Sequence, residues 1–132
     1  MQKLIITFSI FLYTFVVPYL EINETHLFNP DWTPHVRIHE VWQLITNSVI
    51  GLLCLWLTWI KDHVKLSALL SIIITGSFLI AFVLQDFYGG SMKYLDGSEK
   101  TVLGINIGVL GFGVAFILLI FTFLIDKTKP LK

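Results

Sequence analysis

Long apolar stretches separated by short polar segments make up most of the chain. Four such stretches cover residues 4–20, 34–60, 66–86 and 102–125. Each is close to the roughly 17 to 25 residues that a helix needs to cross the hydrocarbon core of a bilayer. We therefore predict an all-α integral membrane protein, in which residues 1–132 form a single four-helix transmembrane bundle.

The second stretch opens with a strong helix start. Thr33 can accept a hydrogen bond from a free backbone N–H as the N-cap, and Pro34 has no N–H to leave unpaired at the first helical position. A helix over 34–60 would be about 40 Å long, which exceeds the roughly 30 Å hydrocarbon core. Its first turns should therefore stand in or above the membrane interface.

The composition agrees with a membrane protein and reduces the classes of partner to consider. The chain is 55% hydrophobic and 14% charged, and its mean hydropathy is +0.79. Its formal net charge is zero and it has no run of basic residues, so nothing points to a nucleic-acid partner. Residues 4–20 also resemble a signal peptide, but no small-residue cleavage site follows, so we expect this helix to be retained. The lipid bilayer is the one partner that the sequence identifies.

The charges between the apolar stretches predict an orientation. One side carries six basic residues, namely Lys3, Lys61, Lys65, Lys127, Lys129 and Lys132. The other side carries three, namely Arg37, Lys93 and Lys100. Because cytoplasmic loops are richer in Lys and Arg, we predict a bacterial inner-membrane protein with both termini in the cytoplasm. The polar segment 21–47 would then face outward.

That polar segment contains three of the four histidines. On a helix with about 100° per residue, one polar stripe falls within about 80°, and Asn47 flanks it. Polar groups at membrane depth are costly unless they are paired or face a cavity, so the stripe should point into the bundle. The stripe consists of His35, His39, Trp42, Gln43 and Thr46.

Candidate catalytic residues follow from this placement. His35 and His39 could move protons, with a carboxylate supplied by Glu24 or Asp86, or by Asp31. Glu40 lies off the stripe and three residues from Arg37, which favours an ion pair between those two. Further polar and aromatic residues could bind a substrate, namely His26, Trp32, Gln43, Asn47 and Asn106.

The histidine spacing also fits a metal. His35 and His39 lie four residues apart on one helix face, where both can bind a single ion, and His26 and Glu24 could complete the site. A divalent metal, acid–base chemistry and simple hydrogen-bonded interfacial histidines all stay open. We expect no b-type haem, because the third and fourth stretches offer no histidine opposite His39.

A G-x-x-x-G pair occurs in the fourth stretch at Gly104 and Gly108. Small residues at this spacing let helix backbones approach closely. We expect the close approach within the bundle, with a contact between protomers of a homo-oligomer as the alternative.

The run ETHLFNPDWTPHVRIH resembles the signature of a family of small four-helix membrane proteins of bacteria and fungi, E-T-H-x-F-N-P-x-W-x-P-H-x-R-x-H. The matching positions are Glu24, Thr25, His26, Phe28, Asn29, Pro30, Trp32, Pro34, His35, Arg37 and His39. The resemblance implies a four-helix membrane fold over the whole chain. It directs attention to the same residues but implies no particular reaction.

Two classes of function compete on these observations. The first is a lipid-phase enzyme, or a binding protein for a small apolar molecule, with a histidine and carboxylate site at the outer face. The second is an accessory subunit or assembly factor that docks a larger membrane complex. A metal or proton carrier is a third reading, and it is weakened because no acidic or histidine residues continue past Asn47 toward the other side.

Overall fold

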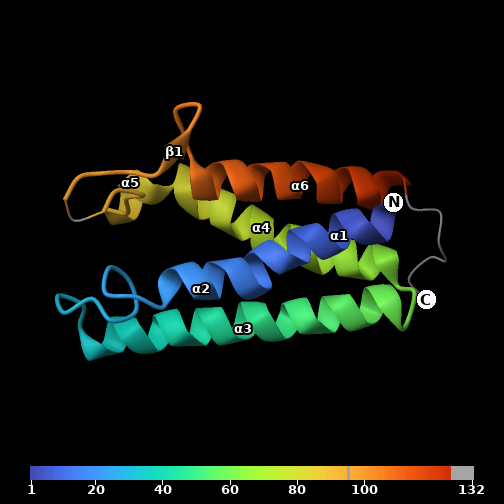
Figure 1. The fold of residues 1–132 in the computed structure, drawn as a ribbon, viewed down its shortest axis with the longest axis horizontal. Coiled ribbons are helices and arrows are strands. Elements are labelled where there is room, and N and C mark those ends of the chain that lie inside the picture. The colour runs from blue at the N-terminus through green and yellow to red at the C-terminus, as the bar shows by residue number, and fades with distance from the viewer. Residues whose placement is uncertain (95, 126–132) are drawn as a thin grey trace.

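Four long helices pack into one bundle in the computed structural model, which describes residues 1–94 and 96–125 (Figure 1). All four are long and apolar enough to cross a membrane, which supports an integral membrane protein and confirms the all-α, four-helix prediction. The first is continuous and consists of α1 (Gln2–Phe11), a π-helical turn η1 (Leu12–Val16) and α2 (Val17–Glu21). The others are α3 (Pro34–Trp59), α4 (Val64–Val83) and α6 (Ile107–Ile125).

The start of α3 agrees with the sequence. Thr33 is the N-cap, and its side chain accepts a hydrogen bond from the backbone N–H of Val36 at 3.4 Å. Pro34 is the first helical residue. The 26 residues of α3 make it the longest helix among the described residues.

The π-helical turn has a cause in the sequence. Pro18 has no backbone N–H, so it cannot donate to the carbonyl of Thr14 one turn earlier. That carbonyl instead accepts a hydrogen bond from the Ser48 hydroxyl of α3 at 3.1 Å. A side chain of a neighbouring helix thus satisfies a backbone group that a bilayer could not hydrate.

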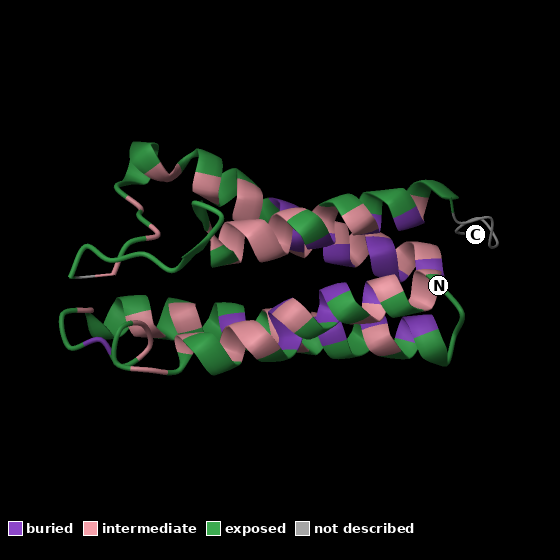
Figure 2. Ribbon diagram, turned by 45° about the horizontal axis from the view of Figure 1, so that its top comes forward, coloured by how far each residue is buried: buried purple, intermediate pink, exposed green. Residues whose placement is uncertain are grey.

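The bundle has a tight end and an open end. We call the end with residue 1 and the turn 60–63 the terminal end, and the end with the segments 22–33 and 89–100 the loop end. The first helix pairs with α3 and α4 pairs with α6, and the two pairs diverge toward the loop end (Figures 1 and 2). Buried residues gather in the half toward the terminal end (Figure 2). The apolar core there consists of Ile6, Ile10, Tyr13, Cys54, Val64, Ala68 and Leu119.

Hydroxyl groups join the helices inside this core. The Tyr13 hydroxyl is hydrogen-bonded to Ser71 Oγ at 3.0 Å, and Thr58 Oγ1 donates to Ser67 Oγ at 2.8 Å. Ser67 Oγ in turn donates to the carbonyl of Cys54 at 3.0 Å. In a bilayer, small residues and hydrogen bonds between helices replace the hydrophobic effect as the source of packing, and this core has both.

The third predicted segment, 66–86, is two helices. α4 ends at Val83, and the single turn α5 (Gln85–Tyr88) follows after a break at Leu84. Tyr88 folds back and donates its hydroxyl hydrogen to the carbonyl of Ala81 at 2.8 Å. Asp86, the charged residue at the end of this segment, therefore lies in α5 and not in the long helix α4.

The fourth predicted segment, 102–125, begins as a hairpin. β1 (Thr101–Val102) pairs antiparallel with β2 (Ile105–Asn106), and Leu103 and Gly104 form the turn with φ values of 54° and 77°. A two-residue turn with both φ values positive matches the twist of paired strands. The predicted G-x-x-x-G helix face is therefore wrong, because Gly104 lies in this turn and α6 starts only at Ile107.

Candidate functional site

The segment 22–33 is shaped by the side chain of Asn23. Its Oδ1 accepts hydrogen bonds from the backbone N–H of Thr25 at 2.7 Å, from the Thr25 hydroxyl at 2.6 Å and from the His26 N–H at 3.2 Å. Its Nδ2 donates to the carbonyl of Leu20 at the end of the first helix. Asparagine favours such turns because its short side chain imitates a backbone group. The turn brings His26 back over the end of α2.

His26 then contacts Glu21, a residue that the sequence did not single out. The Nε2 atom of His26 lies 3.2 Å from Oε2 of Glu21, and both side chains are about seven-tenths buried, with exposures of 31% and 27%. The Nδ1 atom lies 2.9 Å from the Thr25 hydroxyl oxygen. Because that hydroxyl already donates its hydrogen to Asn23, Nδ1 is the donor to Thr25.

With Nδ1 donating to Thr25, a hydrogen bond between Nε2 of His26 and Glu21 requires one proton between these two atoms. The pair is either an imidazolium with a carboxylate or a neutral imidazole with a carboxylic acid. Two groups that differ in chemistry and share one proton in a partly buried place form an arrangement typical of acid–base sites.

Aromatic residues and a lysine surround His26. The rings of Trp32 and Tyr94 meet the imidazole edge-on, with centroids 6.5 and 6.2 Å away. Lys100 Nζ lies 5.6 Å from the centroid of Tyr94. Burial and, to a lesser extent, the positive charge of Lys100 lower the pKa of His26. The two loop-end segments, 22–33 and 89–100, thus meet at this histidine.

Glu40 lies on the inner side of α3 and not at the surface. It is half-buried, and its charge acts on Glu21 across the gap between α2 and α3. The predicted ion pair with Arg37 is wrong for the described residues, where Arg37 Nη2 donates to the carbonyl of Asn29 at 2.8 Å. Arg37 therefore fixes the end of the segment 22–33, and its buried Nε has no protein partner there.

The predicted polar stripe points away from the bundle, contrary to expectation. His35, His39 and Gln43 are exposed, and the indole of Trp42 is 65% exposed. The stripe also includes Thr46, which is exposed, whereas the flanking Asn47 is half-buried. The buried residues of α3 are Leu44, Gly51, Cys54, Leu57 and Thr58. At about 100° per residue, Leu44, Gly51 and Thr58 lie nearly opposite His35.

The remaining candidates do not join His26. Glu24 and Asp86 are exposed, and among the described residues neither forms an ion pair. Asn106 is the N-cap of α6, because its Oδ1 accepts from the N–H groups of Gly108 and Val109 at 2.8 and 3.3 Å. Of the residues predicted to bind substrate, Trp32 alone lies beside His26.

The three candidate metal ligands are divided between two places. His26 contacts Glu21, whereas His35 and His39 contact each other on the outer face of α3. Across residues 1–94 and 96–125, no three His, Cys, Asp or Glu side chains gather closely enough to hold a metal ion. The predicted three-histidine site is therefore not assembled within one chain.

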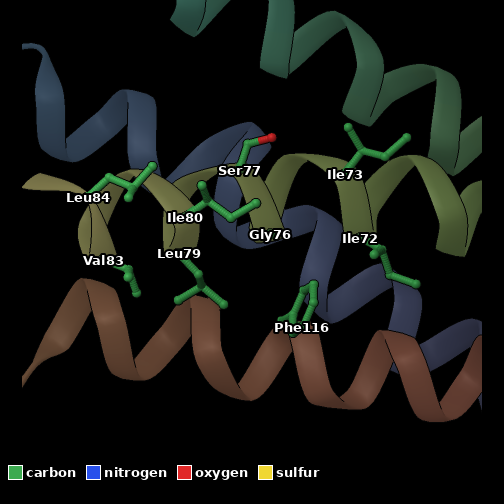
Figure 3. Close-up of a pocket in the computed structure, with 9 residues that line it drawn as sticks. All are labelled: Ile72, Ile73, Gly76, Ser77, Leu79, Ile80, Val83, Leu84 and Phe116. Atoms are coloured by element: carbon green, nitrogen blue, oxygen red, sulfur yellow. The ribbon is translucent and has the colours of Figure 1, made fainter.

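An open apolar pocket lies along the loop-end half of α4. Its volume is about 610 Å³. Figure 3 shows Leu79, Val83 and Phe116 between α4 and α6, with Ile80 beside them. The complete lining is Ile72, Ile73, Gly76, Ser77, Leu79, Ile80, Val83, Leu84 and Phe116. Only Ser77 carries a polar side chain, so the pocket suits a hydrocarbon chain.

Acidification should loosen the contact between the two loop-end segments. The pKa of His26 is lowered in the folded state, so the unfolded segment takes up a proton more readily as pH falls below about 6.5. Stability from this contact is therefore present above that pH and lost as pH falls toward the folded pKa. Amide hydrogen exchange in 22–33, corrected for its intrinsic pH dependence, should be faster at pH 5.5 than at pH 7.5 in a Glu21→Gln background, which removes the titration of the carboxyl that contacts His26. His26→Gln should abolish this difference, and a pH effect that persists in the variant would assign it to another group.

Comparison of the chain with protein-family models, with curated proteins and with solved structures gave no significant match.

Proposed function

We propose that the protein binds a small amphipathic molecule from the bilayer and carries out acid–base chemistry on its polar end. The observation that carries the proposal is the contact between Nε2 of His26 and Oε2 of Glu21 at 3.2 Å. Such a partly buried pair, with the rings of Trp32 and Tyr94 against the imidazole, is a candidate general acid and base.

Each partner has a defined part. His26 keeps its Nδ1 hydrogen bonded to Thr25, so that Nε2 is the atom that gains or loses a proton. Glu21 is the group that accepts or returns that proton. This assignment moves the acid–base role from His35 and His39 to His26, because the first two face outward from the bundle.

The apolar part of the ligand is assigned to the pocket on α4. Several of its walls are exposed to the surroundings of the bundle, including Ile73, Ile80 and Val83 at 55, 62 and 75% exposure. A molecule dissolved in the bilayer can therefore enter from the side. The pocket lining contains no residue of the His26 site, and the link between them is the chain after Leu84, which carries Tyr94 to His26.

The proposed orientation places this chemistry outside the cytoplasm. Lys3, Lys61 and Lys65 lie at the terminal end, and Arg37, Lys93 and Lys100 lie at the loop end. Lys127, Lys129 and Lys132, which also entered the count, lie outside the described residues. The described basic residues are equal in number at the two ends, so the excess of six basic residues over three rests on these C-terminal lysines in the sequence. On that sequence count we place both termini in the cytoplasm of a bacterial cell.

The test is the lipophilic content of the purified protein. We expect organic extracts of detergent-purified wild-type protein to contain one enriched small molecule by mass spectrometry, and Glu21→Gln and His26→Gln to lose it or to accumulate it unconverted. Glu24→Gln and Asp86→Asn are matched controls, because both carboxylates are exposed. An extract that is the same in all five proteins would overturn the proposal.

Two earlier interpretations stay as predictions. An accessory role in a larger membrane complex loses the support of the G-x-x-x-G face, since Gly104 is in the hairpin turn. Membership in the signature family also stays a prediction. Several of its positions, such as Thr25, Asn29 and Arg37, hold the segment 22–33 in shape.

A further inference from the structure

A second pair of imidazoles lies on the exposed side of α3, away from the His26 site. The Nε2 atoms of His35 and His39 are 3.1 Å apart, and the ring centroids are 4.6 Å apart with planes at 83°. Both side chains are exposed. The pair is therefore held by the helix spacing and by the hydrogen bond between the two Nε2 atoms, and it faces the surroundings of the bundle.

The two nitrogens have the separation that a shared metal ion requires. Zinc–nitrogen bonds are about 2.0 to 2.1 Å, so two ligands at a tetrahedral angle lie roughly 3.3 Å apart. The observed 3.1 Å is the length of the hydrogen bond between the rings, so the donor imidazole must move its proton from Nε2 to Nδ1 and both rings must rotate toward one ion. We propose that His35 and His39 chelate one divalent transition-metal ion through their Nε2 atoms.

The donor set defines the class of metal. Two neutral imidazoles favour Cu²⁺, Ni²⁺ and Zn²⁺ over Mg²⁺ and Ca²⁺, which prefer oxygen ligands, and Cu²⁺ binds most tightly of the divalent ions. Two protein ligands leave the other positions to water or to the same pair of a second copy of the chain.

The location permits access from water. α3 is about 39 Å long at about 1.5 Å per residue, and the hydrocarbon core is roughly 30 Å thick. The first turns of α3, which carry both histidines, can therefore stand at the membrane surface. The inference is independent of the proposed function, because it uses neither His26 nor Glu21.

Copper is the probe for the test. Detergent-purified protein at pH 7.5 is titrated with Cu²⁺, and binding is measured by mass spectrometry of the retained metal and by electron paramagnetic resonance. We expect about one Cu²⁺ per chain, or one per two chains if a second copy completes the site, with a nitrogen-coupled spectrum. His35→Asn or His39→Asn should weaken binding about 10²-fold, because the second imidazole acts at high effective concentration.

A matched control is available in His63, an exposed histidine in the turn at the terminal end. His63→Asn should leave Cu²⁺ binding unchanged. Nickel should quench the fluorescence of Trp42, whose ring centroid lies 6.0 Å from that of His39, in wild type and in His63→Asn but not in the His35→Asn/His39→Asn double variant. Equal affinity for Cu²⁺ in wild type and in the His35→Asn/His39→Asn double variant would overturn the proposal.

Discussion

Gly51→Ala is expected to lower the free energy of unfolding by about 1 to 3 kcal/mol, because it overpacks the contact between the first helix and α3. A Cβ atom at this position would lie 1.7 Å from Oγ1 of Thr14, 2.9 Å from its Cβ and 3.0 Å from Cε2 of Tyr13. Rotation of Thr14 could relieve the first contact. It could not relieve the other two, so the helices must separate.

The matched control is Gly111→Ala in α6. No atom lies within 4 Å of a Cβ added there, so the change should be neutral, or stabilising by the helix propensity of alanine. Unfolding of both variants can be compared by circular dichroism during titration with a denaturing detergent. If Gly51→Ala is no less stable than Gly111→Ala, the close approach between η1 and α3 is not a structural requirement.

Tyr13→Ala is expected to cost about 3 kcal/mol or more, because it removes an aromatic ring from the centre of the core and leaves a cavity. The side chain is 1% exposed and packs in the apolar cluster of the terminal half. The variant also removes the hydrogen bond to Ser71 at 3.0 Å, which joins the first helix to α4.

Two further substitutions separate these contributions. Tyr13→Phe keeps the ring and should cost only about 0.6 kcal/mol, the average for an interhelical hydrogen bond in a membrane protein. Tyr19→Ala removes a tyrosine that is 83% exposed and should change stability little. Equal losses for Tyr13→Ala and Tyr19→Ala in the same denaturing titration would show that the core is not centred on Tyr13.

The helices could be predicted from the sequence because length and hydropathy decide them. Four apolar stretches long enough to cross a bilayer, and a Thr-Pro start at residue 33, gave the four-helix bundle and the beginning of α3. The side of α3 that faces the bundle could not be predicted in this way. In a membrane both faces are apolar, so hydropathy does not reveal the rotation of the helix.

Small residues would have been the better guide to that rotation. Gly51, Cys54 and Thr58 are buried, and Glu40 is four residues before the buried Leu44 and shares its face. Following the small residues would have placed Glu40 inside and His35 outside. The prediction followed polarity instead, on the premise that polar groups turn inward, but the first turns of α3 lie where the surroundings can be aqueous.

The contacts of the loop end could not have been predicted residue by residue. The pairing of His26 with Glu21 depends on the turn made by Asn23, and the hairpin before α6 depends on a positive φ at Leu103, a residue that seldom adopts one. Glu21 was visible as the first acidic residue after the first apolar stretch. Nothing in its spacing from His26 indicated that the chain would return to it.

The divergence of the helix pairs toward the loop end has a consequence for the surrounding membrane. A bundle that is narrow at one end and broad at the other occupies unequal areas in the two leaflets (Figure 2). A tapered protein strains the bilayer least where the membrane is curved and the broad end of the protein lies on the convex side. The position of the protein in a cell would then follow membrane shape as well as chemistry.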